Sequence, residues 1–176
     1  MKRSRWRVPL GYVAGIGAFL LATPSPTSLA IGFALALAGE SIRVWASGHI
    51  EKTLVLATGG PYAHTRNPLY LGSVIMAIGF ALAAASAWVG LAVVLYFVVF
   101  YPHVMREEAE FLRERFSEDY ARWESTVPAF LPRITPGGAA ASRFSWQRVA
   151  ANREWRTLAA LPAALAVLVA RMWVRW

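Results

Sequence analysis

Long blocks of uncharged apolar residues are the feature of this chain that most restricts its fold. Of the 176 residues 57% are apolar, and they gather in five segments that approach the roughly 17–25 residues needed to cross a bilayer. Because backbone polar groups in lipid must pair within their own segment, each block is expected to be a helix. The sequence therefore predicts an all-α fold, a polytopic membrane helix bundle that forms a single domain over residues 1–176. The expected spans are Val8–Ala22, Leu29–Ser47, Leu69–Ala87, Trp88–Val104 and Leu158–Val174.

The distribution of positive charge sets the expected orientation of the bundle. Sixteen of the 18 Lys and Arg residues lie on one side of the predicted spans, whereas only Arg171 and Arg175 lie on the other. Cytoplasmic loops carry an excess of Lys and Arg, so we expect the N-terminus and residues 105–156 in the cytoplasm. The net charge of +8 then reflects this topology and the anionic lipid headgroups, because no basic stretch shows a nucleic-acid reader motif.

The segment Arg106–Glu124 has the pattern of a different kind of helix. Its apolar residues recur at helical spacing, and charged residues occupy the opposite face. Such a segment is expected to be an interfacial helix that lies along the membrane surface or packs under the bundle. A second interfacial helix is expected within Ser142–Glu154, and the proline-rich Val127–Pro136 is expected to be a loop. The apolar stripe consists of Phe111, Leu112, Phe116, Tyr120 and Trp123.

Several classes of site are disfavoured by the sequence. There is no cysteine, which excludes disulfides and thiolate metal sites, and there is neither a Walker loop nor a Rossmann pattern. No metal site is predicted: the pair His49 and Glu51 lacks a third ligand and is more typical of a solvated loop. Glu40 and Arg43 lie one turn apart on the second span, where they form either an internal ion pair or part of a polar cavity.

The most specific polar cluster is the sequence HTRNPLY at residues 64–70. Pro68 begins the third span and disfavours helix at Asn67, so free N–H groups are expected at the start of that helix. These groups, with the planar fork of Arg66, can hold a carboxylate, and Tyr62 and Tyr70 offer aromatic rings. Taken alone, the cluster also fits a helix cap with interfacial aromatics and an arginine anchored to lipid phosphate.

A second polar cluster, Arg106-Glu107-Glu108, follows the fourth span and by itself would be read as a solvated charge run. The third and fourth spans are joined by a short turn and must run antiparallel, so Leu69 and Val104 end at the same membrane face. We therefore expect Asn67 and Glu108 to be neighbours. Together they would hold a zwitterion, with its carboxylate near Arg66 and its ammonium or sulfonium near Glu108.

The pattern GPY…RNPLY.G, a hairpin, and then EE…L…F…Y…W…VP.FLP resembles the isoprenylcysteine carboxyl methyltransferase family over about residues 54–132. The related phospholipid N-methyltransferases share part of it. The resemblance implies a methyltransferase that binds S-adenosylmethionine without a Rossmann fold, in a pocket at the cytoplasmic membrane face. It implies a lipophilic substrate, expected to be an isoprenylcysteine-type carboxylate, and no metal.

Carried over by position, the resemblance implies a set of site residues. Arg106 becomes the candidate for meeting a substrate carboxylate, and Glu108 matches the acidic cofactor contact; Arg66 of the polar cluster joins them as a candidate catalytic residue. The implied cofactor-binding residues are Leu54, Val55, Leu56, Ala57, Tyr62, Asn67, Pro68, Leu69, Tyr70 and Glu108, and His64 of the polar cluster is added to them. Two positions depart from the family: Asn67 replaces the usual histidine, and Ser117 replaces the glycine usual after Phe116. The additional spans of the eukaryotic enzymes are also absent.

The expected chemistry leaves the acceptor open. A carboxylate acceptor needs no base, whereas an amine acceptor must lose a proton, for which Glu108, Tyr70 or His64 would serve. Carboxyl O-methylation and N-methylation of a phospholipid or other lipid amine therefore both fit the sequence. It is also compatible with an NADPH-dependent sterol reductase-like protein or a non-enzymatic membrane scaffold, and it does not determine the oligomeric state.

Overall fold

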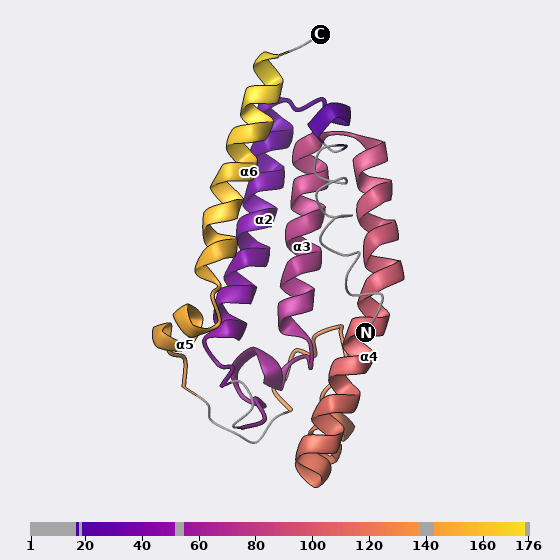
Figure 1. Cartoon of the computed structure of the whole chain (residues 1–176), viewed down its shortest axis with the longest axis vertical. Helices are drawn as coiled ribbons and strands as arrows, with labels where there is room; N and C mark the ends of the chain where they lie inside the picture. The colour runs from indigo at the N-terminus through magenta and orange to yellow at the C-terminus, as the bar shows by residue number, and fades with distance from the viewer. Residues whose placement is uncertain (1–16, 18, 52–54, 138–142, 175–176) are drawn as a thin grey trace.

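The structure is a computed structural model that describes residues 17, 19–51, 55–137 and 143–174. Its described part contains helices and loops but no strand, which confirms the predicted all-α membrane bundle (Figure 1). The elements are α2 (Pro26–Ser47), the short 3₁₀ helix η2 (Gly60–Ala63), α3 (Pro68–Ala84), α4 (Ala87–Thr126), α5 (Trp146–Ala151) and α6 (Trp155–Trp173).

Four of the five predicted spans correspond to helices. α2, α4 and α6 are each long and apolar enough to cross a membrane, and α3 is an apolar helix of 17 residues. α3 and α4 form the expected hairpin, joined by only Ala85 and Ser86. Of the remaining predicted span, Val8–Ala22, only residues 17 and 19–22 are described, so this prediction falls mostly outside the described residues.

α2 and α3 run antiparallel, side by side (Figure 1), and their backbones touch through glycines. A Cβ atom added at Gly39 would lie 2.6 Å from the carbonyl oxygen of Gly72, and one added at Gly79 would lie 2.6 Å from the backbone nitrogen of Ala36. In lipid, where no hydrophobic effect drives helices together, such close packing supplies the attraction between them. The glycines recur every seventh residue on both helices, at positions 32 and 39 and at positions 72 and 79.

We predict that Gly79→Ala destabilises the protein, because its methyl group collides with backbone that has no room to move. The expected loss in the free energy of unfolding is about 1–3 kcal/mol, measured by thermal unfolding in detergent. Gly90→Ala on α4 is the matched control, since a Cβ atom there would meet nothing within 4 Å. Equal stability of the two variants would contradict the close approach of α2 and α3.

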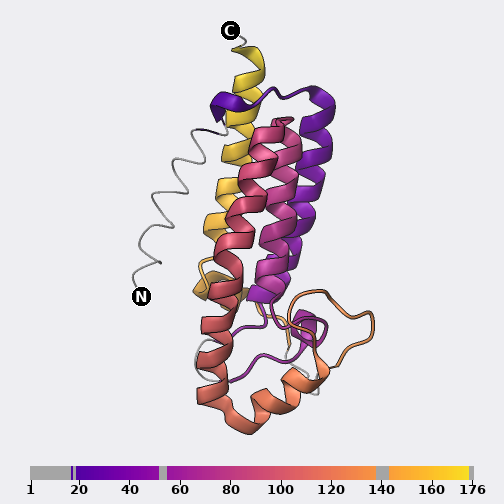
Figure 2. The ribbon, with the colours of Figure 1, turned by 90° about the vertical axis from the view of Figure 1, so that its right-hand side faces the viewer.

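α4 differs from the expectation in where it bends. Residues 106–116 do not form a separate interfacial helix; they continue the spanning helix without a break, because glutamate, arginine and alanine favour helix. The chain turns back only at Ser117, whose φ of 36° and ψ of −102° are not helical, and the second arm returns beneath the bundle (Figure 2). The prediction of a helix under the bundle is confirmed for this second arm, which buries Tyr120 and Trp123, and is wrong for residues 106–116.

We predict that Ser117→Gly stabilises the protein by about 1 kcal/mol, because a positive φ strains every residue that carries a Cβ atom. Thermal unfolding measures the change. Ser125→Gly on the same arm is the control: this position is helical, so glycine there is expected to destabilise slightly. A loss of stability at both positions would contradict the backbone geometry at the kink.

A polar cross-link ties three helices together at the end of the bundle. Nε and Nη2 of Arg43 on α2 lie 2.8 Å and 2.6 Å from Oε1 of Glu154, the residue that immediately precedes α6. Nη1 of Arg43 donates to the hydroxyl of Ser73 on α3 and, at 3.4 Å, to the carbonyl of Leu69. The predicted Glu40–Arg43 pair is present at 3.5 Å, but the shorter ion pair is with Glu154, and it anchors the last span to the rest.

The expectation that His49 and Glu51 lie in a solvated loop holds for Glu51, which is exposed, and is wrong for His49. The His49 side chain is buried, and its Nδ1 lies 2.8 Å from the carbonyl oxygen of Trp45. Glu51 forms an ion pair with Arg148 of α5 at 3.0 Å. Glu51 therefore fastens α5 to the loop after α2, and His49 fastens that loop to the last turns of α2.

Candidate active-site cavity

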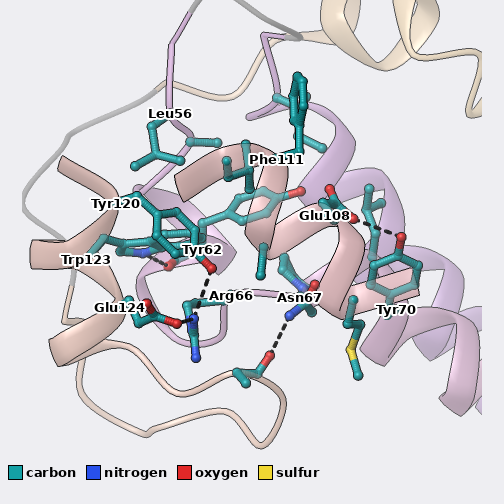
Figure 3. A pocket seen from close by; sticks show the side chains of 18 of the residues that line it. Leu56, Tyr62, Arg66, Asn67, Tyr70, Glu108, Phe111, Tyr120, Trp123 and Glu124 are labelled. Carbon is teal, nitrogen blue, oxygen red and sulfur yellow. Dashed lines mark hydrogen bonds and ion pairs between the residues drawn. The ribbon is translucent and has the colours of Figure 1, made fainter. Parts of the chain in front are cut away.

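A cavity of about 870 Å³ lies at the end of the bundle where α2 ends and α3 and α6 begin. Its walls are the first turns of α3, both arms of α4, η2 and the segment 55–57. The bend at Ser117 creates this space, because it folds the second arm of α4 back toward η2 instead of letting it continue into water (Figure 2). Apolar, aromatic and charged side chains from segments far apart in sequence meet there (Figure 3).

One end of the cavity is acidic and aromatic. The Tyr70 hydroxyl on α3 donates a hydrogen bond of 2.8 Å to Oε2 of Glu108 on α4, and the rings of Tyr70 and Tyr101 pack edge to face with centroids 5.2 Å apart. Asn67 lines the same cavity, so the two polar clusters meet as the hairpin argument predicted (Figure 3). A carboxylate among aromatic rings is a suitable environment for an organic cation.

Tyr62 of η2 lines the cavity between the end at Glu108 and the end at Glu124 (Figure 3). Its carbonyl accepts a 3.0 Å hydrogen bond from Nε1 of Trp123, which fastens η2 to the second arm of α4. Burial, followed by the negative charge of Glu108, raises the pKa of the Tyr62 hydroxyl well above its ordinary value. Tyr62 is therefore a neutral phenol at physiological pH.

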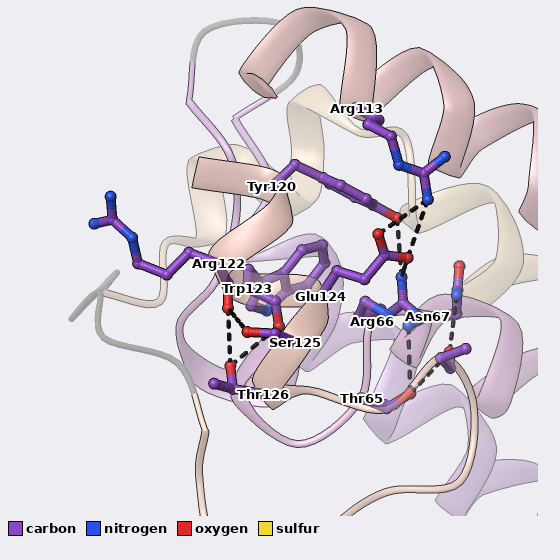
Figure 4. Close-up of polar contacts among 11 residues, drawn as sticks. Thr65, Arg66, Asn67, Arg113, Tyr120, Arg122, Trp123, Glu124, Ser125 and Thr126 are labelled. Atoms are coloured by element: carbon purple, nitrogen blue, oxygen red, sulfur yellow. Dashed lines mark hydrogen bonds and ion pairs between the residues drawn. The ribbon is translucent and has the colours of Figure 1, made fainter. Parts of the chain in front are cut away.

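The opposite end of the cavity is held by an ion-pair network around Glu124 (Figure 4). Nη1 of Arg66 donates to Oε1 of Glu124 and, at 3.1 Å, to the hydroxyl of Tyr120, while Nη2 of Arg113 lies 2.9 Å from Oε2 of Glu124. Burial acts to raise the pKa of Glu124, but the hydrogen bonds from Arg113 and Arg66 outweigh it and bring the pKa below its ordinary value. Two guanidinium groups share one carboxylate here, and Glu110, which also lines the cavity, adds a negative charge near Arg113.

This network corrects the expectation that Arg66 offers a free fork to a ligand carboxylate. Glu124 already occupies one side of the Arg66 guanidinium. No sequence pattern singles out Glu124, because its contact with Arg66 arises only after the bend at Ser117 sets the register of the second arm.

We predict that Glu124→Gln lowers the free energy of unfolding by about 1 kcal/mol at neutral pH, a modest value because the pair is partly exposed. Since the pKa of Glu124 is lowered in the folded protein, its stabilising effect is complete above the ordinary value of 4.5 and is lost as the pH falls through the lower folded value. The difference in stability between wild type and variant should thus stay constant from neutral pH down to about 4.5 and shrink below it. Thermal unfolding across this range tests the prediction, with the exposed Glu118→Gln as control; a difference that vanishes already at neutral pH would contradict it.

Asn67, at the position of the family histidine, supports the wall of the cavity. Its Nδ2 donates to the carbonyl of Ala129 at 2.8 Å, and the backbone N–H of Arg66 donates to the carbonyl of Pro128 at 2.9 Å. These bonds fasten the loop after α4 to the start of α3. An amide suits this position, because it donates to a carbonyl oxygen whatever the pH.

The other predicted site residues divide into three groups. Those that line the cavity are Val55, Leu56, Ala57, Pro68, Leu69 and Arg106. Leu54 lies outside the described residues. His64 does not line this cavity: its Nδ1 lies 2.9 Å from the carbonyl oxygen of Arg133, and its ring faces Trp45. Among the described residues, no group of three His, Asp or Glu side chains is arranged to hold a metal ion.

The fold defines an integral membrane protein with a cavity lined by apolar, aromatic and charged side chains at one end of its spans. Residues 16–119, more than half of the chain, match the phospholipid methyltransferase family. The chain belongs to this family of membrane methyltransferases.

Two curated relatives are similar to the chain. The cobalt-zinc-cadmium resistance protein CzcN of Cupriavidus metallidurans is 35% identical over 107 residues, and the nickel-cobalt-cadmium resistance protein NccN of Alcaligenes xylosoxydans xylosoxydans is 34% identical over 109 residues. Each alignment covers 60% of this chain and 48% of the relative, so the chain spans about half the length of the curated relatives it matches. No solved structure matches the chain significantly.

Proposed function

We propose that the protein is an S-adenosylmethionine-dependent methyltransferase that acts on a lipophilic acceptor at the cytoplasmic membrane face. The observation that carries the proposal is the Tyr70–Glu108 hydrogen bond, which joins the two sequence clusters around one cavity at the end of the spans. The family supports methyl transfer as the reaction class. The concentration of arginine around the cavity end supports a cytoplasmic orientation.

The donor set of the cavity suits S-adenosylmethionine, whose amino-acid part is zwitterionic and whose sulfur is cationic. Glu108 with Tyr70 and Tyr101 offers an anionic, aromatic end, while the guanidinium groups of Arg66 and Arg113 around Glu124 offer cationic groups at the opposite end. These two guanidinium groups take the place of the free Arg66 fork that the sequence suggested. The apolar Leu56 and Ala57 are then suited to cover the nucleoside.

The acceptor proposed is a carboxylate on a lipophilic group, of the isoprenylcysteine type. Arg106 lies on the cavity wall beside Met105 and Pro102 of α4, where its cationic head can meet a carboxylate while the apolar part of the acceptor stays near the spans. A lipid amine is the second candidate, favoured by the family and by the acidic, aromatic end around Glu108.

The two acceptors make different demands on this chain. Bound S-adenosylmethionine supplies the methyl group of its sulfonium, and the rest of the cofactor leaves as a neutral thioether. A carboxylate acceptor forms the new O–C bond with its own electron pair and releases no proton, so the protein has only to align it and exclude water. An amine acceptor must first give up a proton, and Glu108 is the base on the cavity wall.

We predict that Glu108→Gln weakens binding of S-adenosylmethionine about tenfold or more, because a hydrogen bond to a charged group contributes about 1.5–3 kcal/mol. Calorimetric titration of the purified protein measures the affinity. Glu107→Gln is the matched control, since the neighbouring Glu107 is exposed and does not line the cavity. Equal loss, or no loss, in both variants would remove Glu108 from the site.

The function itself is tested by methyl transfer from labelled S-adenosylmethionine to a panel of acceptors. A prenylated cysteine, its methyl ester, phosphatidylethanolamine and total lipid extract separate the two candidate acceptors. Labelling of the free carboxylate but not of its ester supports carboxyl O-methylation, and base-stable labelling of the phospholipid supports N-methylation. No labelling of any acceptor by a sample that binds the cofactor would contradict the proposed substrate class.

A further inference from the structure

We propose that the loop of residues 127–137 is an interfacial membrane anchor that inserts Leu131 and Ile134 between lipid headgroups beside the cavity. These side chains are 77% and 97% exposed, although the loop that carries them is firmly held. The proposal concerns how the polar end of the protein sits on the bilayer, and it does not depend on the reaction proposed above.

Hydrogen bonds between the loop and residues 63–65 hold the loop along its length. The Thr65 hydroxyl donates to the carbonyl of Phe130 at 2.9 Å, the Arg133 N–H donates to the carbonyl of His64 at 3.0 Å, and the Gly137 N–H donates to the carbonyl of Ala63 at 2.7 Å. Three prolines, at positions 128, 132 and 136, restrict the backbone further. The two apolar side chains are thus displayed by a pre-organised backbone rather than by a segment free to bury them.

The charged side chain of the same loop, that of Arg133, is held by hydrogen bonds within the chain. Nη1 of Arg133, the charged residue between Leu131 and Ile134, donates to the carbonyl of Thr126, and its Nη2 donates to the Thr135 hydroxyl at 3.2 Å. Isolated exposed apolar residues are ordinary on protein surfaces. Leu131 and Ile134, however, are both highly exposed on one firmly held loop, and the guanidinium of Arg133 between them is bound by the chain itself. This arrangement indicates an apolar contact outside the chain.

The position of the loop identifies that contact as the bilayer. Figure 2 shows residues 127–137 to one side of the bundle and mostly below the ends of the spans, with the upper edge of the loop level with the first turn of α3. α2 ends and α3 begins near this level, so the loop reaches the membrane boundary that the spans define. Lipid at the headgroup level of a bilayer accommodates short apolar side chains on a polar backbone.

The anchor would also fix the position of the cavity relative to the bilayer surface. Ala129, two residues before Leu131, lines the cavity and accepts the Asn67 hydrogen bond. Insertion of Leu131 therefore holds this part of the wall at the depth where the polar head of a lipid lies.

The test exploits the absence of cysteine from the chain. Four single-cysteine variants, Leu131→Cys, Ile134→Cys, Val98→Cys and Glu118→Cys, are labelled with an environment-sensitive NBD fluorophore and reconstituted in phosphatidylcholine–phosphatidylglycerol vesicles. Val98 is exposed on the apolar part of α4 and reports the bilayer, whereas Glu118 is exposed at the kink of α4 and reports water. Quenching is then measured with lipids carrying a nitroxide near the headgroup and with aqueous iodide.

The proposal expects blue-shifted emission at positions 131 and 134, quenching there by the headgroup nitroxide, and iodide quenching several-fold weaker than at position 118. Emission and iodide quenching equal to those at position 118 would overturn it. Protection from iodide without quenching by the nitroxide would also overturn it, because it would assign the loop to contact with another protein molecule. The readout requires no enzymatic activity, so it is separate from the test of methyl transfer.

Discussion

The direct contact between the backbones of α2 and α3 is the constraint on which the rest of the structure depends. Glycines at positions 39, 72 and 79 leave no space for a side chain between the two helices. A membrane bundle holds together through such packing, and here it also sets the register between the end of α2 and the start of α3. A Cβ atom at Gly72 would lie 2.7 Å from Cγ of Arg43, so the absence of a side chain at Gly72 is what allows Arg43 to cross to α3.

The arrangement of the polar side chains at the cavity end of the bundle follows from that register. Arg43 binds the first turn of α3 and Glu154 at the start of α6, which fixes three helices at one membrane boundary. The α3–α4 hairpin then brings Tyr70 to Glu108, and the bend at Ser117 brings Glu124 to Arg66. The result is a cavity with a carboxylate among aromatic rings at one end and the network of Arg66, Glu124 and Arg113 at the other.

Segments beyond the family match complete the cavity. The match ends at residue 119, whereas Tyr120, Trp123 and Glu124 close one side of the cavity and Ala129 forms part of its wall. Glu154 of α6 reaches the site indirectly, through Arg43. The common part of the family thus supplies the hairpin and its two polar clusters, and the C-terminal part of this chain supplies the enclosure around them.

The sequence by itself determined the elements and their pairing. Four spans, the antiparallel hairpin and the position of Asn67 and Glu108 at one cavity follow from the lengths of the apolar blocks and from one short turn. The membrane requires each block to be a helix, and a short turn forces consecutive helices to run antiparallel. Only the tertiary structure decided where α4 bends, that Glu124 occupies one side of Arg66, and that His64 binds Arg133 and does not line the cavity. These features depend on contacts between residues far apart in the chain, such as Arg66 and Glu124, which are 58 residues apart. Local periodicity carries no information about which distant partner a side chain meets, because that choice is made by the packing of the whole bundle.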